Sequence, residues 1–345
     1  MSSVTTSSFF RWPRAGERVR PPTTRVREFA PVIERVLLKS SVRIATRLVT
    51  GVSLAMVAVI TVLASVGPMV AARAGATSLK APDVFYLDIG ASISVGVQPT
   101  TATPSGRPTL RGYANDLVAL AAAKGISLQL TELGCPGETL ATMVSGADGC
   151  YHGTDSQLSD AVAFLRSHTH QVGIVTVDLG YNTFQTCFKG KVSITTCAAQ
   201  MAVVVRRQLT GILKTLTAAA GPHVTFIGVG HYDPFLASYL GGPRGRSRAA
   251  TSLSAFNLFN QSLRDTYRAF AIPMANIARA FNANALARVR VPGLGPLPEN
   301  VARICTLTWM CHRAPYGPNI HPNDWGYHLM ARAILALLPA TTSSH

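Results

Sequence analysis

Four short stretches of this sequence carry side chains that could perform chemistry. Ser92 ends the apolar alternating run in "YLDIGASISVGVQP", and His321 precedes Pro322 at the entry to a helical pattern. A serine hydroxyl can attack an acyl carbon when an imidazole takes its proton. Fixed N–H donors must then hold the oxygen of the tetrahedral intermediate. These residue types together predict acyl chemistry at Ser92, although Ser92 considered alone would be interpreted as a turn residue.

The remaining two stretches supply the N–H donors. Gly137 lies in "LGCPGETLATM" and Asn182 lies in "DLGYNTF". We expect the backbone N–H groups of Ser92 and Gly137 and the side-chain amide of Asn182 to bind the oxyanion. Gly137 could also serve as a turn glycine with positive φ, and Asn182 could instead cap the helix that follows it.

The imidazole of His321 needs an acceptor at its second nitrogen, because that bond fixes the tautomer. Asn319 in "NIHPNDWGYHLMA" is one possible acceptor, and a nearby backbone carbonyl is another. Asp324 could also reach the ring, but we expect it to cap the last helix. An amide stabilises an imidazolium less than a carboxylate does, so this pattern predicts a slow enzyme.

These stretches must be positioned by a scaffold, and apolar runs alternate along the chain with helical patterns. The pattern predicts strands at 84–89, 127–133, 173–179 and 223–229, and helices at 113–124, 156–167, about 199–218, 253–271 and 324–338. Such alternation indicates a parallel sheet covered by helices on both faces. Ligands of these sheets gather beyond the carboxyl ends of the strands. The turn-rich segments "GGPRGRSR" and "RVPGLGPLPEN" are expected to be surface loops.

The N-terminal part of the chain differs from the rest in composition. Residues 1–47 carry ten Lys or Arg residues against three Glu residues, which predicts a disordered basic arm. The segment from Leu48 to Ala72 contains no charged residue and is long enough to contact and cross a membrane as a helix. The positive arm would remain in the cytoplasm. Residues 48–76 are thus either a cleaved signal sequence or a membrane anchor, and residues 77–345 form one extracellular α/β domain.

The charge of +16 does not indicate a nucleic-acid partner. Seven of these charges belong to the basic arm, and the arginines beyond it are scattered without interleaved aromatic residues. A groove for single-stranded nucleic acid would need clustered basic residues and aromatic residues interleaved with them. The basic surface could favour anionic envelope polymers or lipid head groups.

All six cysteines lie beyond the apolar segment. An even number in an exported chain predicts disulfides. Six cysteines allow fifteen pairings, and closing short loops loses the least chain entropy. We therefore predict the pairs Cys135–Cys150, Cys187–Cys197 and Cys305–Cys311. Metal binding is the alternative, but the spacings lack the C-x₂-C pattern of structural zinc sites.

In their order, the four stretches resemble the Ser, Gly, Asn and His blocks of the SGNH (GDSL-like) hydrolase superfamily. "LGCPGET", "YDPFLA" at 232–237 and "CTLTWMC" are similar to an actinobacterial secreted lipase and esterase branch with three local disulfides. The resemblance covers about 84–338. It implies a three-layer α/β/α flavodoxin-like fold and an exported monomer that cleaves an acyl ester of a lipid or glycan through acyl-Ser92, with His321 as the base and no cofactor or metal.

The sequence also departs from the pattern of the superfamily. Ala91 and Thr183 stand where the superfamily usually has Asp, and Asn319 lies near the place of the acid that orients the histidine. These departures leave alternatives open. The chain could be a catalytically degraded binding protein of the cell envelope, or an acyltransferase or deacetylase that acts on glycans or lipids.

Overall fold

The computed structural model of the chain describes residues 84–147, 150–190 and 192–338, which all belong to one compact unit. The predicted basic arm and the apolar segment 48–72 lie outside the described residues. Within the described ranges, no helix combines the length and the apolar character needed to span a membrane.

A five-stranded sheet forms the centre of this unit. Its order is β2-β1-β3-β4-β5, and every neighbouring pair is parallel. The strands are β1 (Val84–Gly90), β2 (Leu128–Glu132), β3 (Val172–Asp178), β4 (Thr225–Val229) and β5 (Met274–Ala275). This is the flavodoxin-like order, with its switch point between β1 and β3, so the predicted fold class is confirmed. The two-residue strand β5 carries too little pattern to be predicted.

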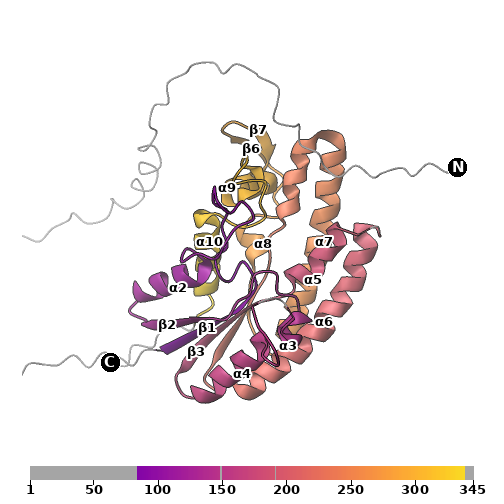
Figure 1. Cartoon of the computed structure of the whole chain (residues 1–345). Coiled ribbons are helices and arrows are strands. Elements are labelled where there is room, and N and C mark those ends of the chain that lie inside the picture. The colour runs from indigo at the N-terminus through magenta and orange to yellow at the C-terminus, as the bar shows by residue number, and fades with distance from the viewer. Residues whose placement is uncertain (1–83, 148–149, 191, 339–345) are drawn as a thin grey trace, which may run out of the picture. The chain divides into compact units, whose positions relative to one another are not determined.

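Helices cover both faces of the sheet (Figure 1). One layer contains α2 (Tyr113–Ala122), α8 (Ile277–Ala280), α9 (Glu299–Leu307) and α10 (Asp324–Leu335), and the other contains α4 (Gln157–Ser167), α6 (Ile194–Ala219) and α7 (Gly242–Arg268). Strand β1 shows how the sequence produces two cores, because successive side chains of a strand point to opposite faces. Tyr86 enters the core under the first layer, and Leu87 and Ile89 enter the core under the second.

Short elements connect the main ones. They are α3 (Thr142–Ser145), α5 (Tyr181–Gln185), η1 (Thr186–Phe188), η2 (Pro234–Gly241), η3 (Trp309–Cys311), β6 (Arg288–Val291) and β7 (Gly295–Pro298). The four predicted strands and five predicted helices are all present. Their ends differ from the predicted ones by a few residues, except at the start of α6 and of α7.

The prediction that "GGPRGRSR" is a surface loop is wrong, because α7 begins within it at Gly242. Proline near the first position suits a helix start, and Pro243 lies there. Gly245 and Ala249 are buried against the preceding segment, and a Cβ on Gly245 would lie 2.1 Å from the Ser238 carbonyl oxygen. Close packing against η2 therefore outweighs the low helix propensity of glycine.

The prediction that "RVPGLGPLPEN" is only a loop is also wrong. Strands β6 and β7 form an antiparallel hairpin, and α9 begins at Glu299. Val291 and Leu297 are buried in the first core. Of the turn residues that suggested a loop, Pro292 and Gly293 lie in the connection between the two strands, whereas Gly295, Pro296 and Pro298 belong to β7.

All three predicted disulfides are confirmed. The bonds join Cys135 to Cys150, Cys187 to Cys197 and Cys305 to Cys311. Each bond lies near one of the segments that the sequence marks for chemistry: Cys135 precedes Gly137, Cys187 follows Asn182, and the third bond closes the segment before His321.

Candidate active site

Ser92 lies in the turn after β1, at the carboxyl end of the sheet. The turn is closed by the Val97 N–H, which donates to the Ser92 carbonyl oxygen at 2.9 Å, and by Ser94 Oγ, which donates to the Ala91 carbonyl oxygen at 2.8 Å. The Ser92 side chain is half-buried. Its own N–H donates to no acceptor within the described part of the chain. This N–H is therefore open to a ligand.

A buried polar bridge joins the turn that carries Ser92, called the serine turn, to the loop that carries Gly137 and Glu138, called the glycine loop. Gln157 Oε1 accepts from the Gly90 N–H at 2.8 Å, and Gln157 Nε2 donates to the Gly90 carbonyl oxygen at 2.9 Å and to Glu138 Oε2 at 3.0 Å. Both Gln157 and Glu138 are fully buried. Sequence reasoning missed both residues. Glu138 lies within the quoted "CPGET", but nothing in the sequence marks Gln157 except its place after the capping Ser156.

Gly137 belongs to the glycine loop, and Asn182 is hydrogen-bonded to that loop. Gly137 has φ of +94°, which favours glycine, and its N–H has no acceptor within the described residues. Asn182 Nδ2 donates to the Glu138 carbonyl oxygen at 2.9 Å. A side-chain amide carries two hydrogens, so one remains for another acceptor. Asn182 lies inside α5, whose cap position is Gly180, and it is therefore not the helix cap.

Thr183 adds a second link between the asparagine and glycine segments. Its Oγ1 accepts from the Leu140 N–H at 3.0 Å. The departure from Asp at this position therefore keeps a hydrogen-bond acceptor, and the segments that carry Gly137 and Asn182 remain joined.

His321 is held by Asn319. Asn319 Oδ1 lies 2.7 Å from His321 Nδ1 and also accepts from the His321 backbone N–H at 3.0 Å. An amide oxygen can only accept, so Nδ1 carries the proton and Nε2 has the free lone pair. This is the tautomer that a general base requires.

The amide of Asn319 is itself fixed from the other side. Asn319 Nδ2 donates to the carbonyl oxygens of Pro104 and Ser105, at 3.1 Å and 3.2 Å. A carboxylate at this position would place an oxygen against two carbonyl oxygens. The surroundings of residue 319 therefore favour an amide over a carboxylate.

Neighbouring segments hold the backbone around His321. The Tyr232 hydroxyl donates to the Ile320 carbonyl oxygen at 2.6 Å. The Trp309 N–H donates to the His321 carbonyl oxygen at 3.0 Å, and the Asn319 N–H donates to the Trp309 carbonyl oxygen at 3.2 Å. Because the Cys305–Cys311 disulfide encloses Trp309, it stabilises the pairing that positions His321.

The prediction that Asp324 caps the last helix is wrong. Asn323 is the cap, because its side chain accepts from the Gly326 N–H. Asp324 instead accepts from Gln98 Nε2 at 2.8 Å and pairs with Arg111. Asp324 therefore ties the start of α10 to the loop that follows the serine turn.

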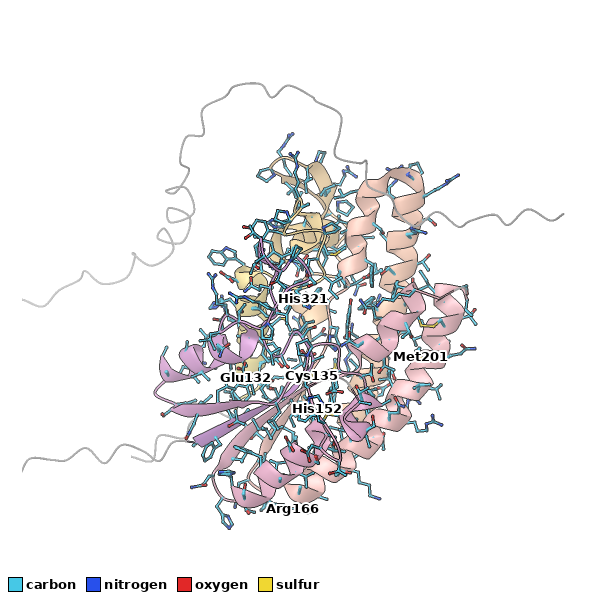
Figure 2. All side chains as sticks on the ribbon, in the orientation of Figure 1. Glu132, Cys135, His152, Arg166, Met201 and His321 are labelled. Atoms are coloured by element: carbon cyan, nitrogen blue, oxygen red, sulfur yellow. A yellow bond between two sulfur atoms is a disulfide. The ribbon has the colours of Figure 1, made fainter. Side chains whose placement is uncertain are left out.

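Burial determines the protonation of His321. The residue is 8% exposed, and burial lowers its pKa to about 4 because the charged form loses water. His321 is therefore neutral at pH 7. Its Nε2 has no hydrogen-bond partner within the described residues, so no bond from Ser92 Oγ to Nε2 is formed in this structure. Figure 2 shows His321 above Cys135 in that view, at one end of the sheet.

A second buried histidine, which sequence reasoning missed, follows β4. His231 Nε2 lies 3.4 Å from Asp178 Oδ1, and the two residues are 2% exposed. The distance would suit an ion pair, but burial lowers the pKa of His231 to about 4. Burial and the nearby Asp88 raise the pKa of Asp178 well above its usual range. Both shifts favour the uncharged forms, a neutral imidazole and a protonated carboxyl.

The described residues contain no group of three or more His, Cys, Asp or Glu side chains arranged to hold a metal ion. The segments described above supply an imidazole at His321, a hydroxyl at Ser92 and N–H donors at Ser92, Gly137 and Asn182. This arrangement can accept a proton at one nitrogen and can donate hydrogen bonds to an anion.

Comparisons with known proteins give distant similarities only. No family model and no curated protein matches the chain. Among solved structures, the extracellular lipase from Streptomyces rimosus is similar at 16% identity and a TM-score of 0.46, over 74% of this chain and 100% of that chain. Phospholipase A1 from Streptomyces albidoflavus has 15% identity and a TM-score of 0.45, over 74% and 98%. The aryl esterase of M. smegmatis has 12% identity and a TM-score of 0.42, over 73% and 97%.

Proposed function

We propose that the chain is a serine ester hydrolase of the SGNH type, in which Ser92 is the nucleophile and His321 is the general base. The observation that carries this proposal is the Asn319–His321 contact of 2.7 Å. It fixes the proton on Nδ1 and leaves Nε2 without a partner, as a base that takes a hydroxyl proton needs.

The reaction would pass through an acyl-enzyme. His321 Nε2 takes the proton of Ser92 as Oγ attacks the carbonyl carbon of the ester. The tetrahedral intermediate collapses when His321 returns the proton to the leaving alcohol. His321 Nε2 then takes a proton from water as the water oxygen attacks the acyl carbon, and it gives that proton to Ser92 Oγ when the acid is released.

Three donors support the charge of the intermediate in this proposal. The N–H groups of Ser92 and Gly137 have no acceptor within the described residues, and Asn182 has one amide hydrogen left after its bond to Glu138. Losing one donor of this kind typically lowers turnover by about 10² to 10³. The proposal requires Ser92 Oγ to reach His321 Nε2 during the reaction, because this structure forms no bond between the two atoms.

The proposal includes an exported location. The three disulfides are consistent with an oxidising compartment, where such bonds persist. Residues 48–76 would direct the export or anchor the chain, and residues 77–345 would act as the hydrolase domain on acyl esters of lipids or glycans.

Hydrolysis of a panel of p-nitrophenyl esters of increasing acyl length tests the proposal. We expect the purified full chain to hydrolyse at least one ester, and Ser92→Ala to abolish that activity. Ser105→Ala is the matched control, because Ser105 is an exposed serine in the neighbouring loop and contributes only its backbone carbonyl to the Asn319 contact.

Hydrolysis that survives in Ser92→Ala would contradict the proposed nucleophile. A folded wild-type chain that hydrolyses no ester of the panel would contradict the proposed hydrolase activity. Stoichiometric release of p-nitrophenol without turnover would indicate an acyl-enzyme that transfers its acyl group to another acceptor.

A further inference from the structure

A polar cleft lies at the far edge of the sheet from Ser92. Its volume is about 530 Å³, and α7, α8 and the segment 282–285 line it. Figure 1 shows α8 beside α7. The cleft adjoins the carboxyl end of β5, which is three strands from β1 in the sheet order. Three strand spacings correspond to about 14 Å, so this cleft is separate from the Ser92 turn.

The lining of this cleft has an unusual composition. It contains five asparagines, one glutamine, two arginines and three alanines, and it contains neither a carboxylate nor an aromatic residue. Most small-molecule pockets are lined mainly by apolar side chains. We call this site the amide cleft; the residues used below are Asn257, Arg264, Asn276, Arg279, Asn282 and Asn284.

Both arginines of the amide cleft lack an acidic partner. Arg264 Nη1 donates to Gln261 Oε1 at 2.6 Å, and Arg279 uses only its backbone N–H in a side-chain contact. Neither guanidinium forms an ion pair within the described ranges. The surrounding stretch is strongly basic, because residues 234–298 contain eight arginines and one acidic residue. Two unpaired guanidinium groups favour an anionic ligand such as a phosphate or carboxylate.

The asparagines of the cleft hold one another in place but keep polar atoms available. Asn257 Nδ2 donates to Asn284 Oδ1 at 3.0 Å, which leaves Asn257 Oδ1 and Asn284 Nδ2. Asn276 Oδ1 accepts from the Arg279 N–H, and Asn282 Nδ2 donates to Glu299 Oε1 at 2.6 Å. The cleft therefore offers both donors and acceptors. Neighbouring hydroxyl groups of a sugar or polyol, which donate and accept at once, match such a set.

One lining residue of the cleft, Asn260, is fixed by three hydrogen bonds. Asn260 is 4% exposed, and its amide accepts from the His231 N–H and donates to the carbonyl oxygens of His231 and Phe256. Asn260 has no spare hydrogen for a ligand. It ties α7, which carries Arg264, to the segment after β4.

We propose that the amide cleft binds a saccharide that carries an anionic group, either a phosphate or a carboxylate. The guanidinium groups of Arg264 and Arg279 bind the anion, and the side-chain amides bind hydroxyl groups. This binding site does not depend on the proposed chemistry at Ser92.

Calorimetric titration of the purified full chain at low ionic strength tests the proposal. The probes are mannose 6-phosphate and glucuronate, and the reference probes are mannose and inorganic phosphate. We expect at least one anionic sugar to bind at least about tenfold more tightly than either reference probe, because it uses both sets of contacts. The double variant Arg264→Gln/Arg279→Gln should weaken that binding by about tenfold or more.

The matched control is Arg206→Gln/Arg207→Gln, which removes the same two charges from exposed positions of α6. Binding in this control should stay within about twofold of the wild type. Equal losses in the two double variants would overturn the site, since they would indicate a general charge effect. Binding of inorganic phosphate as tight as that of the sugars would overturn the saccharide assignment, and no binding of either anionic sugar would overturn the proposal. Ester hydrolysis is not used, so failure of the Ser92 proposal would leave this result unchanged.

Discussion

Two buried histidines, His321 and His231, lie on segments that one hydrogen bond joins, because Tyr232 donates to the Ile320 carbonyl oxygen. Burial lowers the pKa of each to about 4. The groups that face the two rings differ. His321 contacts a fixed amide and keeps Nε2 open, whereas His231 faces Asp178 and packs against the rings of Tyr181 and Phe259.

This difference shows that a perturbed pKa does not by itself identify a catalytic histidine. Desolvation produces the same shift in a structural and in a candidate catalytic imidazole. What distinguishes His321 is the Asn319 amide that fixes its tautomer, together with an Nε2 that faces no carboxyl group within ion-pair distance in the described residues. His231 Nε2 instead lies 3.4 Å from Asp178 Oδ1.

The largest expected effect on kcat comes from removing the imidazole of His321, and removing that of His231 is the comparison. His321→Gln should lower kcat on a p-nitrophenyl ester by on the order of 10³- to 10⁴-fold, because the general base is lost. His231→Gln should leave kcat within about threefold and lower the free energy of unfolding by about 1–3 kcal/mol. Steady-state kinetics and denaturant unfolding of both variants check this pair. A large loss of kcat in folded His231→Gln would remove the distinction between the two histidines.

Two asparagines extend the comparison. Asn182→Ala should lower kcat by about 10²- to 10³-fold with little change in KM, because an oxyanion donor acts mainly in the transition state. Asn260→Ala should act on stability, since all polar atoms of that amide bond to the backbone of α7 and of His231. Similar kinetics for Asn182→Ala and the wild type would show that Asn182 only holds the glycine loop.

The contact between Asn319 and His321 gives a smaller effect and a pH signature. Wild-type activity should fall only as the pH drops through about 4, because His321 must be neutral and its pKa is about 4. Asn319→Ala should lower kcat by about tenfold through loss of the tautomer contact. Asn319→Asp should move this acidic limb to higher pH, because a carboxylate stabilises the imidazolium and raises the pKa.

Profiles of kcat against pH for the wild type, Asn319→Ala and Asn319→Asp test whether residue 319 acts on His321. Asn319→Asp should also lower the melting temperature, because its second oxygen faces the Pro104 and Ser105 carbonyl oxygens. An unchanged acidic limb in folded Asn319→Asp would mean that residue 319 does not act on His321.

The smallest expected effect concerns the protonated carboxyl beside His231. The folded state holds a proton on Asp178 that the unfolded chain releases above its ordinary pKa of about 4. The wild-type free energy of unfolding therefore falls as the pH rises from about 4 toward the higher pKa that Asp178 has in the folded state. Asp178→Asn lacks this dependence, so its free energy of unfolding relative to that of the wild type should rise between pH 5 and pH 8. Parallel curves for the two proteins would instead indicate an ionised Asp178 paired with a charged His231.

Much of the fold could be predicted from the sequence, because the strands and helices have strong periodic patterns. The local disulfides were predictable for an entropic reason, since short loops close most easily. The start of α7 could not be predicted from "GGPRGRSR", because its helix depends on close contact between Gly245 and Ser238. Strand β5 has only two residues, and no pattern can be recognised over that length.

The candidate site was also predictable in part. Residue types and order indicated Ser92, Gly137, Asn182 and His321, and spacing suggested Asn319 as a partner of His321. The bridge from Gly90 through Gln157 to Glu138 joins residues that are 67 and 19 positions apart. Such pairings follow from the packing of α4 under the sheet, and they carry no local signal.

Mapping the adduct of a fluorophosphonate probe by peptide mass spectrometry tests the central claim most directly. Such a probe phosphonylates an activated serine with loss of fluoride, and it reacts slowly with ordinary hydroxyl groups. The account predicts one adduct, at Ser92, formed in the wild type and strongly slowed in His321→Gln. A folded wild-type chain that gives an adduct on another serine, or an adduct at Ser92 whose rate does not depend on His321, would contradict it.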